Sequence, residues 1–272
     1  MIAGVNYPSD VAAGLALGRQ VAALVITRGE TDGTDAKWTG SVPSGPGTWN
    51  GTNPILPMAG TWNPWVLSSQ SEFRPSPPIP YDSPEKAAEL VELRNFPRTT
   101  QSNNEALFWE AAGGLRAHQY WNEQLSKKSL EYRLDENPPR AARSLVLPFV
   151  TLYDAAIACW EAKYTYWAIR PFQLDLEVKP VFTTPNHPSY PAAHACSSIA
   201  VTLVLGYLFP RDVESFAALG ERAAQSRIWA GIHYRSDVDA GRSLAIAIAD
   251  KVIERAKRDG ADALNGGKRH GR

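Results

Sequence analysis

This sequence has no excess of positive or negative charge, only two cysteines and no long uninterrupted apolar run. The 28 basic and 28 acidic residues give a formal net charge of zero, so no overall field would attract nucleic acid or an anionic membrane. The two cysteines, Cys159 and Cys196, cannot build a multi-disulfide framework and lack metal-ligand spacing, so we expect both in the core. Any anion binding must therefore be local.

No segment has the pattern of a leader or a membrane span. Residues 1–26 have no basic region at their start, and Asp10 and Arg19 interrupt their apolar character. The apolar stretch 199–209 has only about half of the length that a spanning helix needs. The sequence therefore predicts a soluble protein without a membrane span, and it leaves the compartment open.

The chain is long enough to bury a large core, since 44% of its 272 residues are hydrophobic. Apolar residues recur at helical spacing along most of it, with Pro or Gly at the turns. We therefore predict an all-α fold, a helical bundle. Helices are expected at 9–27, 83–95, 102–127, 139–169, 191–209, 210–230 and 236–258.

Composition divides the chain into four parts. Residues 1–28 form one apolar helix, and 29–82 form an irregular wrap rich in Gly, Pro and Trp, which we expect to pack onto a scaffold because of its tryptophans. Residues 83–260 form the bundle that carries the chemistry. The last residues, 261–272, are predicted to be a flexible tail.

An internal repeat connects the two ends of the chain. Residues 3–14 and 230–241 are identical at eight of twelve positions, and each copy leads into an apolar helix. We interpret this as duplication of a helix-entry unit in which Asn6 takes the place of His233. One hypothesis is that the chain is a shortened form of a two-bundle protein, and a homodimer is one way to replace the missing bundle.

Lys163 and Arg170 are the first candidate site residues. They are seven positions apart, or two helical turns, so both can point to the same side of one helix before Pro171 ends it. In that arrangement they can hold two oxygens of one anion. Alone, such a pair is more often a solvated basic face.

His194 is the second candidate. It follows Pro191, Ala192 and Ala193 and lies just inside the start of an apolar helix. Free backbone N–H groups and the helix dipole favour an anion there. A lone histidine at such a place is usually structural, so its significance depends on the other motifs.

The third element contains Arg227, His233 and Asp237. His233 and Asp237 are one helical turn apart, so the carboxylate can accept the Nδ1 proton and leave Nε2 as a nucleophile or ligand. Arg227 adds a planar fork for an oxyanion. The alternative is an ordinary surface His–Asp pair.

Taken in order, K-x6-R-P, P-x-x-H and S-R-x5-H-x3-D resemble the signature of the phosphatidic acid phosphatase type 2 and vanadium-dependent haloperoxidase superfamily. The Trp- and Pro-rich wrap is similar to that of soluble bacterial haloperoxidase-related proteins. The resemblance implies a pocket for vanadate or phosphate. In that pocket the anion oxygens are held by Lys163, Arg170, Arg227 and the backbone of Ala192 and Ala193. His233 bonds the central atom and is oriented by Asp237. His194 acts as acid and base.

Two positions qualify this resemblance. The family usually has Ser-Gly where this chain has Ala192-Ala193, which removes a hydroxyl and adds methyl bulk, so we expect weaker anion binding. His187 matches by position a site associated with halide preference, and histidine there is similar to the bromide type. A polar loop residue is an equally good interpretation of His187.

Three functions follow from the resemblance. The favoured one is a vanadate-dependent haloperoxidase that oxidises halide, preferably bromide, with hydrogen peroxide and uses Lys163 in catalysis. The alternative is an acid phosphatase that hydrolyses phosphomonoesters through a phosphohistidine at His233, with His194 as acid and base. The third is a degenerate, non-catalytic helical scaffold, against which the retention of all six pocket residues argues.

Overall fold

The computed structural model describes residues 4–261, whose regular secondary structure is helical, with no strand among them. The all-α prediction is confirmed. One isolated backbone bridge, between Thr48 and Ala168, is the single β-type pairing in the described part of the chain. The helices are α1 (Pro8–Gly29), α2 (Pro84–Asn95), α3 (Thr100–Glu110), α4 (Ala117–Glu131), α5 (Pro138–Tyr166), α6 (Pro171–Leu174), α7 (Ala200–Leu208), α8 (Val213–Trp229) and α9 (Arg235–Lys257).

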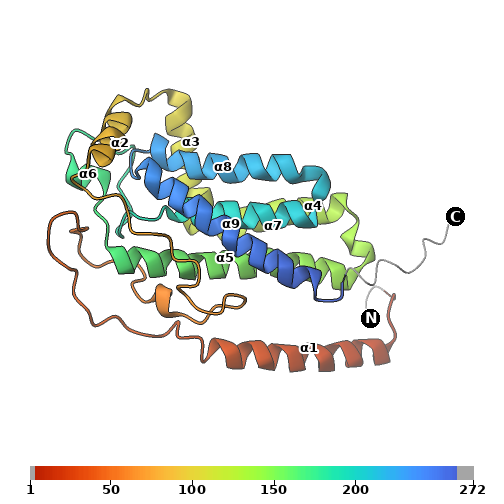
Figure 1. Cartoon of the computed structure of the whole chain (residues 1–272). Coiled ribbons are helices and arrows are strands. Elements are labelled where there is room, and N and C mark those ends of the chain that lie inside the picture. The colour runs from red at the N-terminus through yellow and green to blue at the C-terminus, as the bar shows by residue number, and fades with distance from the viewer. Residues whose placement is uncertain (1–3, 262–272) are drawn as a thin grey trace.

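Four helices form the centre of the molecule. Helices α5, α7, α8 and α9 pack on one another, while α3 covers α8 and α4 covers α5 (Figure 1). The apolar residues of α7 face neighbours on several sides, and Val204 and Leu205 are fully buried. Helix α9 buries one stripe, including Val238, Ile248 and Val252, as expected for an amphipathic helix against a core.

Two π-helical turns adjust the bundle near His194. The predicted helix 102–127 is wrong as one element, because the turn η2 (Ala111–Leu115) follows α3 and the backbone leaves helical geometry at Gly114. The turn η4 (Ala195–Ile199) leads directly into α7. A Cβ on Gly113 would lie 2.5 Å from the His194 ring, so glycine at 113 allows the two turns to approach.

The predicted helix 139–169 is too long at its C-terminal end. Helix α5 ends at Tyr166, and Trp167 adopts the left-handed conformation with φ 50°. Here the wrap replaces the helical hydrogen bonding: the Trp49 N–H donates to the Trp167 carbonyl at 2.6 Å. Lys163 therefore lies on α5, whereas Arg170 lies beyond it in extended backbone, as the following Pro171 favours.

The wrap lies against α5. The buried carboxylate of Asp154 accepts hydrogen bonds from three consecutive backbone N–H groups, those of Trp65, Val66 and Leu67, at 2.7, 2.7 and 3.0 Å. Trp49 is 2% exposed and fills the space beside Trp167. An irregular segment keeps a defined path here because a buried carboxylate and aromatic packing replace regular hydrogen bonding.

Helix α1 has no buried residue and lies apart from the bundle in Figure 1. Its end is attached through Arg28, which donates to the carbonyl of Pro64 at 2.6 Å and lies 4.0 Å from the centroid of the Trp65 ring. By length and composition, α1 and the half-buried α5 could each cross a membrane. The expected absence of a membrane span stays a prediction, as do the domain boundaries. From residue 262 onward the predicted tail lies outside the described residues.

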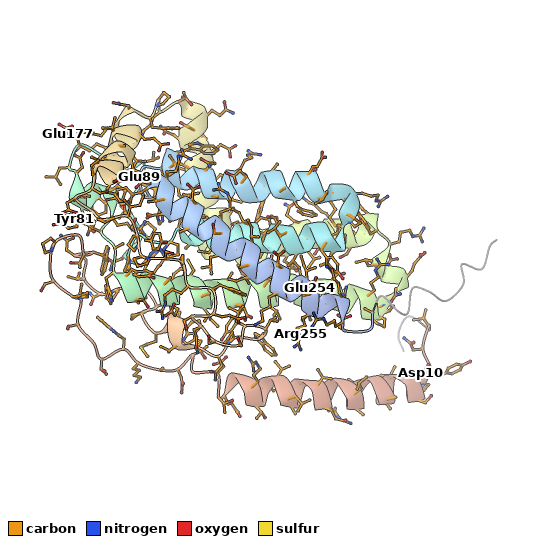
Figure 2. The ribbon with its side chains drawn as sticks, in the orientation of Figure 1. Asp10, Tyr81, Glu89, Glu177, Glu254 and Arg255 are labelled. Carbon is orange, nitrogen blue, oxygen red and sulfur yellow. The ribbon has the colours of Figure 1, made fainter. Side chains whose placement is uncertain are left out.

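The two copies of the internal repeat have the same local structure. Gly4 and Gly231 have φ values of 68° and 71°. At the start of α1 the Asp10 carboxylate accepts from the backbone N–H three residues earlier at 3.0 Å, and Asp237 does the same in α9 at 3.2 Å. Asp10 lies at the outer end of α1 (Figure 2), whereas Asp237 is 1% exposed.

Candidate active site

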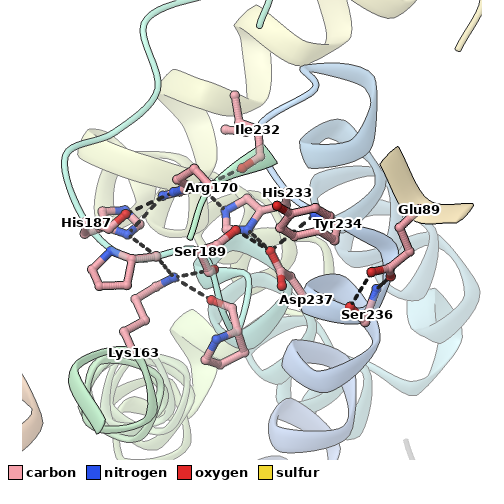
Figure 3. A network of polar contacts seen from close by, with 12 residues as sticks. Glu89, Lys163, Arg170, His187, Ser189, Ile232, His233, Tyr234, Ser236 and Asp237 are labelled. Atoms are coloured by element: carbon pink, nitrogen blue, oxygen red, sulfur yellow. Dashed lines mark hydrogen bonds and ion pairs between the residues drawn. The ribbon is translucent and has the colours of Figure 1, made fainter. Parts of the chain in front are cut away.

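The structure brings the three motifs to one buried place at the wrap end of the bundle. Figure 3 shows the part of this site that contains Lys163, Arg170, His233 and Asp237. Each side chain is at most 8% exposed, although all are polar and most carry charge. Lys163 comes from α5, Arg227 from the end of α8 and Asp237 from the first turn of α9. The segments between the helices supply Arg170, His187 and His233, and His194 lies in the helical turn that begins at Ala193 and continues into η4.

A carboxylate orients the His233 ring. One oxygen of Asp237, Oδ2, accepts from His233 Nδ1 at 3.0 Å and from the Ser189 hydroxyl at 2.5 Å. Burial raises the pKa of Asp237, while the nearby Lys86 ammonium and the Ser189 hydrogen bond oppose that rise. Burial lowers the pKa of His233 well below its usual value, and the Arg170 and Lys163 charges add to this effect. The neutral imidazole therefore exposes Nε2 as its basic nitrogen.

Arg170 lies directly against His233. Its Nη1 is 2.9 Å from His233 Nε2 and 2.7 Å from the carbonyl of Ile232. On its other side the guanidinium contacts His187, through the carbonyl at 3.0 Å and Nδ1 at 3.1 Å. Burial lowers the pKa of Arg170 to about 10, so it remains a cation at neutral pH.

Lys163 acts as a tether in this geometry. Its ammonium donates to the carbonyls of Pro188, Ser189 and Pro191, at 2.9, 2.9 and 2.5 Å. Three bonds use the three donors of an ammonium, so Lys163 supplies positive charge to the site and no free N–H. Burial lowers the pKa of Lys163 to about 8.

His194 is held by a backbone carbonyl. Its Nε2 lies 2.8 Å from the Trp109 carbonyl, so Nε2 carries the proton in the neutral ring and Nδ1 is left to exchange one. Burial lowers the pKa of His194 well below its usual value, and the Arg227 charge lowers it further. A bound anion would act in the opposite direction and favour the protonated ring.

Arg227 is only partly neutralised. Its Nη1 pairs with Glu110 at 2.6 Å, and its Nη2 donates to the Ala106 carbonyl at 3.3 Å. Glu110 itself is 36% exposed, so its charge is partly screened by solvent. Arg227, at 1% exposure, is more deeply buried than its partner.

The charge balance of the site fits a bound oxyanion. Three buried cations, Lys163, Arg170 and Arg227, face the two carboxylates of Asp237 and Glu110, which leaves one positive charge without a counterpart. Buried cations are costly unless they are neutralised. An oxyanion such as phosphate or vanadate, which have nearly the same tetrahedral shape, would supply the missing negative charge.

The helix start before His194 differs from the expected anion cradle. The Ala192 N–H donates to the Asp237 carbonyl at 2.9 Å, so it is already engaged and ties the loop to α9. Ala192 is fully buried, which explains why a small residue stands there. Oxyanion binding by the backbone of Ala193 stays a prediction.

A cleft of about 240 Å³ on the side of the wrap borders this site at Asp237, the one residue of the site that lines it. Its walls come from residues 46–48 and 78–81 of the wrap and from Tyr166, Tyr234 and Asp237 of the bundle. Lys86 also lines it, 3.7 Å from the centroid of the Tyr234 ring.

Sequence patterns did not identify several residues that organise the site. Ser189 lies two residues before the second motif, and its bond to Asp237 connects positions that are 48 apart. Glu110 and the Trp109 carbonyl come from α3, which carries no motif. Only a three-dimensional arrangement could identify them, because no local spacing links them to the histidines.

Comparison with known proteins gives one family and two kinds of relative. Residues 144–254 match the model of the PAP2 superfamily. A non-specific acid phosphatase of Providencia stuartii is 33% identical over 158 residues, which is 56% of this chain and 59% of that protein. One from Salmonella typhi is 36% identical over 85 residues, 30% of this chain and 34% of its own length.

Among solved structures, a bacterial vanadium-dependent iodoperoxidase has a TM-score of 0.65 and 25% identity, and the match covers 83% of this chain and 63% of that chain. An apo bacterial vanadium-dependent chloroperoxidase has a TM-score of 0.62 at 14% identity, over 79% of this chain and 59% of that one, and shows the fold alone. This chain spans less than two thirds of each of these proteins.

Proposed function

We propose that this chain, which belongs to the PAP2 superfamily through residues 144–254, is a phosphomonoesterase that forms a phosphohistidine on His233. The observation that carries the proposal is the pair of contacts on His233, with Asp237 at Nδ1 and Arg170 at Nε2. The 33% identity to an acid phosphatase supports the same reaction. The favoured function from the sequence, haloperoxidase, becomes the second candidate.

Binding places the phosphate between the two arginines. The phosphoryl oxygens take up donors of Arg170 and Arg227, and Arg170 Nη1 leaves His233 Nε2 as it turns to the anion. Lys163 contributes charge while it keeps its three carbonyl partners. The buried surroundings strengthen these interactions relative to water.

In the first chemical step, the Nε2 lone pair of His233 attacks phosphorus and the bond to the ester oxygen breaks. His194, protonated beside the bound dianion, gives its proton to the leaving oxygen. Asp237 stabilises the positive charge that the ring gains when the P–N bond forms. The products are the alcohol and the phosphohistidine.

The second step returns the enzyme to its starting state. Neutral His194 takes a proton from water as the water oxygen attacks phosphorus, and the P–N bond breaks. The electron pair returns to His233 Nε2, and inorganic phosphate leaves. Arg170 and Arg227 hold the same oxygens in both steps, so the charge is stabilised throughout.

The test is hydrolysis of p-nitrophenyl phosphate by the purified chain without vanadate, together with quenching of labelled substrate under alkaline conditions, where phosphohistidine survives. We expect turnover and label on the protein. His233→Ala should remove both, and His118→Ala, at an exposed histidine, should leave both unchanged. Folding of His233→Ala is checked by its Tm and by retained phosphate binding. Turnover by a folded His233→Ala protein would overturn the proposal.

A vanadate-dependent haloperoxidase is the second candidate, favoured by the iodoperoxidase match that covers 83% of this chain. Vanadate would be held by Arg170, Arg227 and His233 and would supply activation of hydrogen peroxide toward halide. His187, 5.3 Å from the Trp160 ring and bonded to Arg170, is the residue for halide preference in this proposal. Vanadate-dependent oxidation of bromide by peroxide, lost in His233→Ala, would support it. If neither assay gives turnover, the scaffold hypothesis is favoured.

A further inference from the structure

The two cysteines of the sequence are in contact. Cys159 and Cys196, 37 positions apart, are both fully buried, and their sulfur atoms are 2.6 Å apart. Their expected place in the core is confirmed, and there they form a contact pair of free thiols.

The pair lies directly behind the candidate active site. Cys159 is one helical turn before Lys163 on α5, and Cys196 is in η4, two residues after His194. The Cys159 sulfur is 3.9 Å from the Pro191 carbonyl, which also accepts a hydrogen bond from Lys163 at 2.5 Å. The thiols thus join the element that carries the ammonium to the element that carries the proton-exchanging histidine.

We propose that Cys159 and Cys196 are a disulfide-forming pair that covalently fastens α5 to η4 when an oxidant is present. With hydrogen peroxide, two S–H bonds and the O–O bond break, one S–S bond forms, and two molecules of water are released. Because the sulfurs already lie 2.6 Å apart, formation of the S–S bond needs only a small further approach of the two side chains. The chain has no third cysteine that could compete intramolecularly.

The position of this crosslink determines what it would do. The covalent loop from 159 to 196 encloses most of the site, including Lys163, Arg170, His187, Ser189 and His194. Closing this loop reduces the conformational freedom of the unfolded chain. We therefore expect a higher Tm, by on the order of 10 °C for a loop of this length in a domain of this size.

The inference does not depend on which reaction the site performs. Two small, oxidisable core residues would also fill the space, and a purely packing role is the competing explanation. The two explanations differ in their response to oxidation. A packing role predicts two thiols that persist or are oxidised separately, whereas the proposed pair is converted to one disulfide.

The experiment uses the purified full chain, reduced and then treated with hydrogen peroxide. Both samples are then denatured and treated with N-ethylmaleimide, and their intact masses are measured. The oxidised chain should carry no maleimide adduct and weigh about 2 Da less than the unblocked reduced chain, whereas the reduced chain should carry two adducts. The Tm should rise on oxidation and return on reduction.

Cys196→Ala and Cys159→Ala are the matched controls, since each keeps one thiol and cannot form the intramolecular bond. Neither should show the mass loss or the reversible rise in Tm. The proposal is overturned if the oxidised wild-type chain still takes two adducts, if it gains oxygen without losing two hydrogens, or if either variant shows the same rise in Tm.

Discussion

Arg170 donates to His233: its Nη1 lies 2.9 Å from the imidazole Nε2. An arginine always donates, so Nε2 must be the acceptor and Nδ1 must carry the ring proton. Asp237 accepts that proton at 3.0 Å. The two neighbours therefore fix one tautomer from opposite sides, and it is the tautomer that a nucleophilic histidine needs.

Arg170→Lys should sharply reduce phosphatase activity. Lysine keeps a charge but loses the fork that reaches His233, the Ile232 carbonyl and His187 together. We expect kcat/KM for p-nitrophenyl phosphate to fall by about 100-fold or more. Arg222→Lys, at an exposed surface ion pair, is the control and should stay near wild type. Wild-type activity in Arg170→Lys would argue against contact between Arg170 and the anion.

Asp237→Asn and Ser189→Ala should differ in severity. The first removes the charge that stabilises the His233 ring in the reaction, and we expect kcat to fall by roughly 100-fold or more. Ser189→Ala keeps the carboxylate and removes one hydrogen bond to it, so we expect kcat to fall by only roughly 2- to 10-fold. Steady-state kinetics of both variants check the order. Equal losses would show that the carboxylate acts only through the Ser189 bond.

Lys86 should set the acid limit of activity. Its ammonium is 3% exposed, bonds Glu89 and Ser236, and lowers the pKa of Asp237 against the rise caused by burial. Lys86→Met should let that pKa rise, so the acidic limb of the kcat/KM profile should move to higher pH. Lys127→Met, at an exposed position, should leave the profile in place. An unchanged profile in Lys86→Met would contradict this coupling.

Acidification should destabilise the fold, and phosphate should oppose this effect. Burial lowers the pKa values of His187, His194 and His233 in the folded protein, so below about pH 6.5 the unfolded chain binds more protons. Stability therefore falls as pH falls through that window, by up to about 1.4 kcal/mol per histidine and pH unit. The raised pKa of Asp237 acts in the opposite sense, adding stability that is fully present at low pH and lost as pH rises through the folded value.

Thermal unfolding from pH 7.5 to 5, with and without inorganic phosphate, measures this balance. We expect Tm to fall below about pH 6.5 and to fall less with phosphate, because a bound anion favours protonated histidines. His187→Asn should flatten the dependence, and His118→Ala should leave it unchanged. A Tm that is independent of pH and of phosphate would contradict a buried, anion-binding histidine cluster.

The sequence was sufficient for the helical class and for the residues that gather at the site, because turn residues and motif spacing are local properties. It failed where a distant segment decides the local structure. Lys163 and Arg170 were expected on one helix, but the wrap binds the Trp167 carbonyl and ends α5 between them. The η2 turn at Gly114 and the pairing of Arg227 with Glu110 also depend on packing between α3 and its neighbours.

The repeated helix start at Asp10 and Asp237 allows one local structure to be compared in two different surroundings. The same residues build the same hydrogen bond twice, once at the surface and once in the interior. Differences in chemistry between the two copies come from their surroundings and from the four positions at which they differ, among them Asn6 in place of His233. A helix start that merely shapes the chain when water surrounds it becomes part of a reactive centre when arginines, lysine and protein walls enclose it.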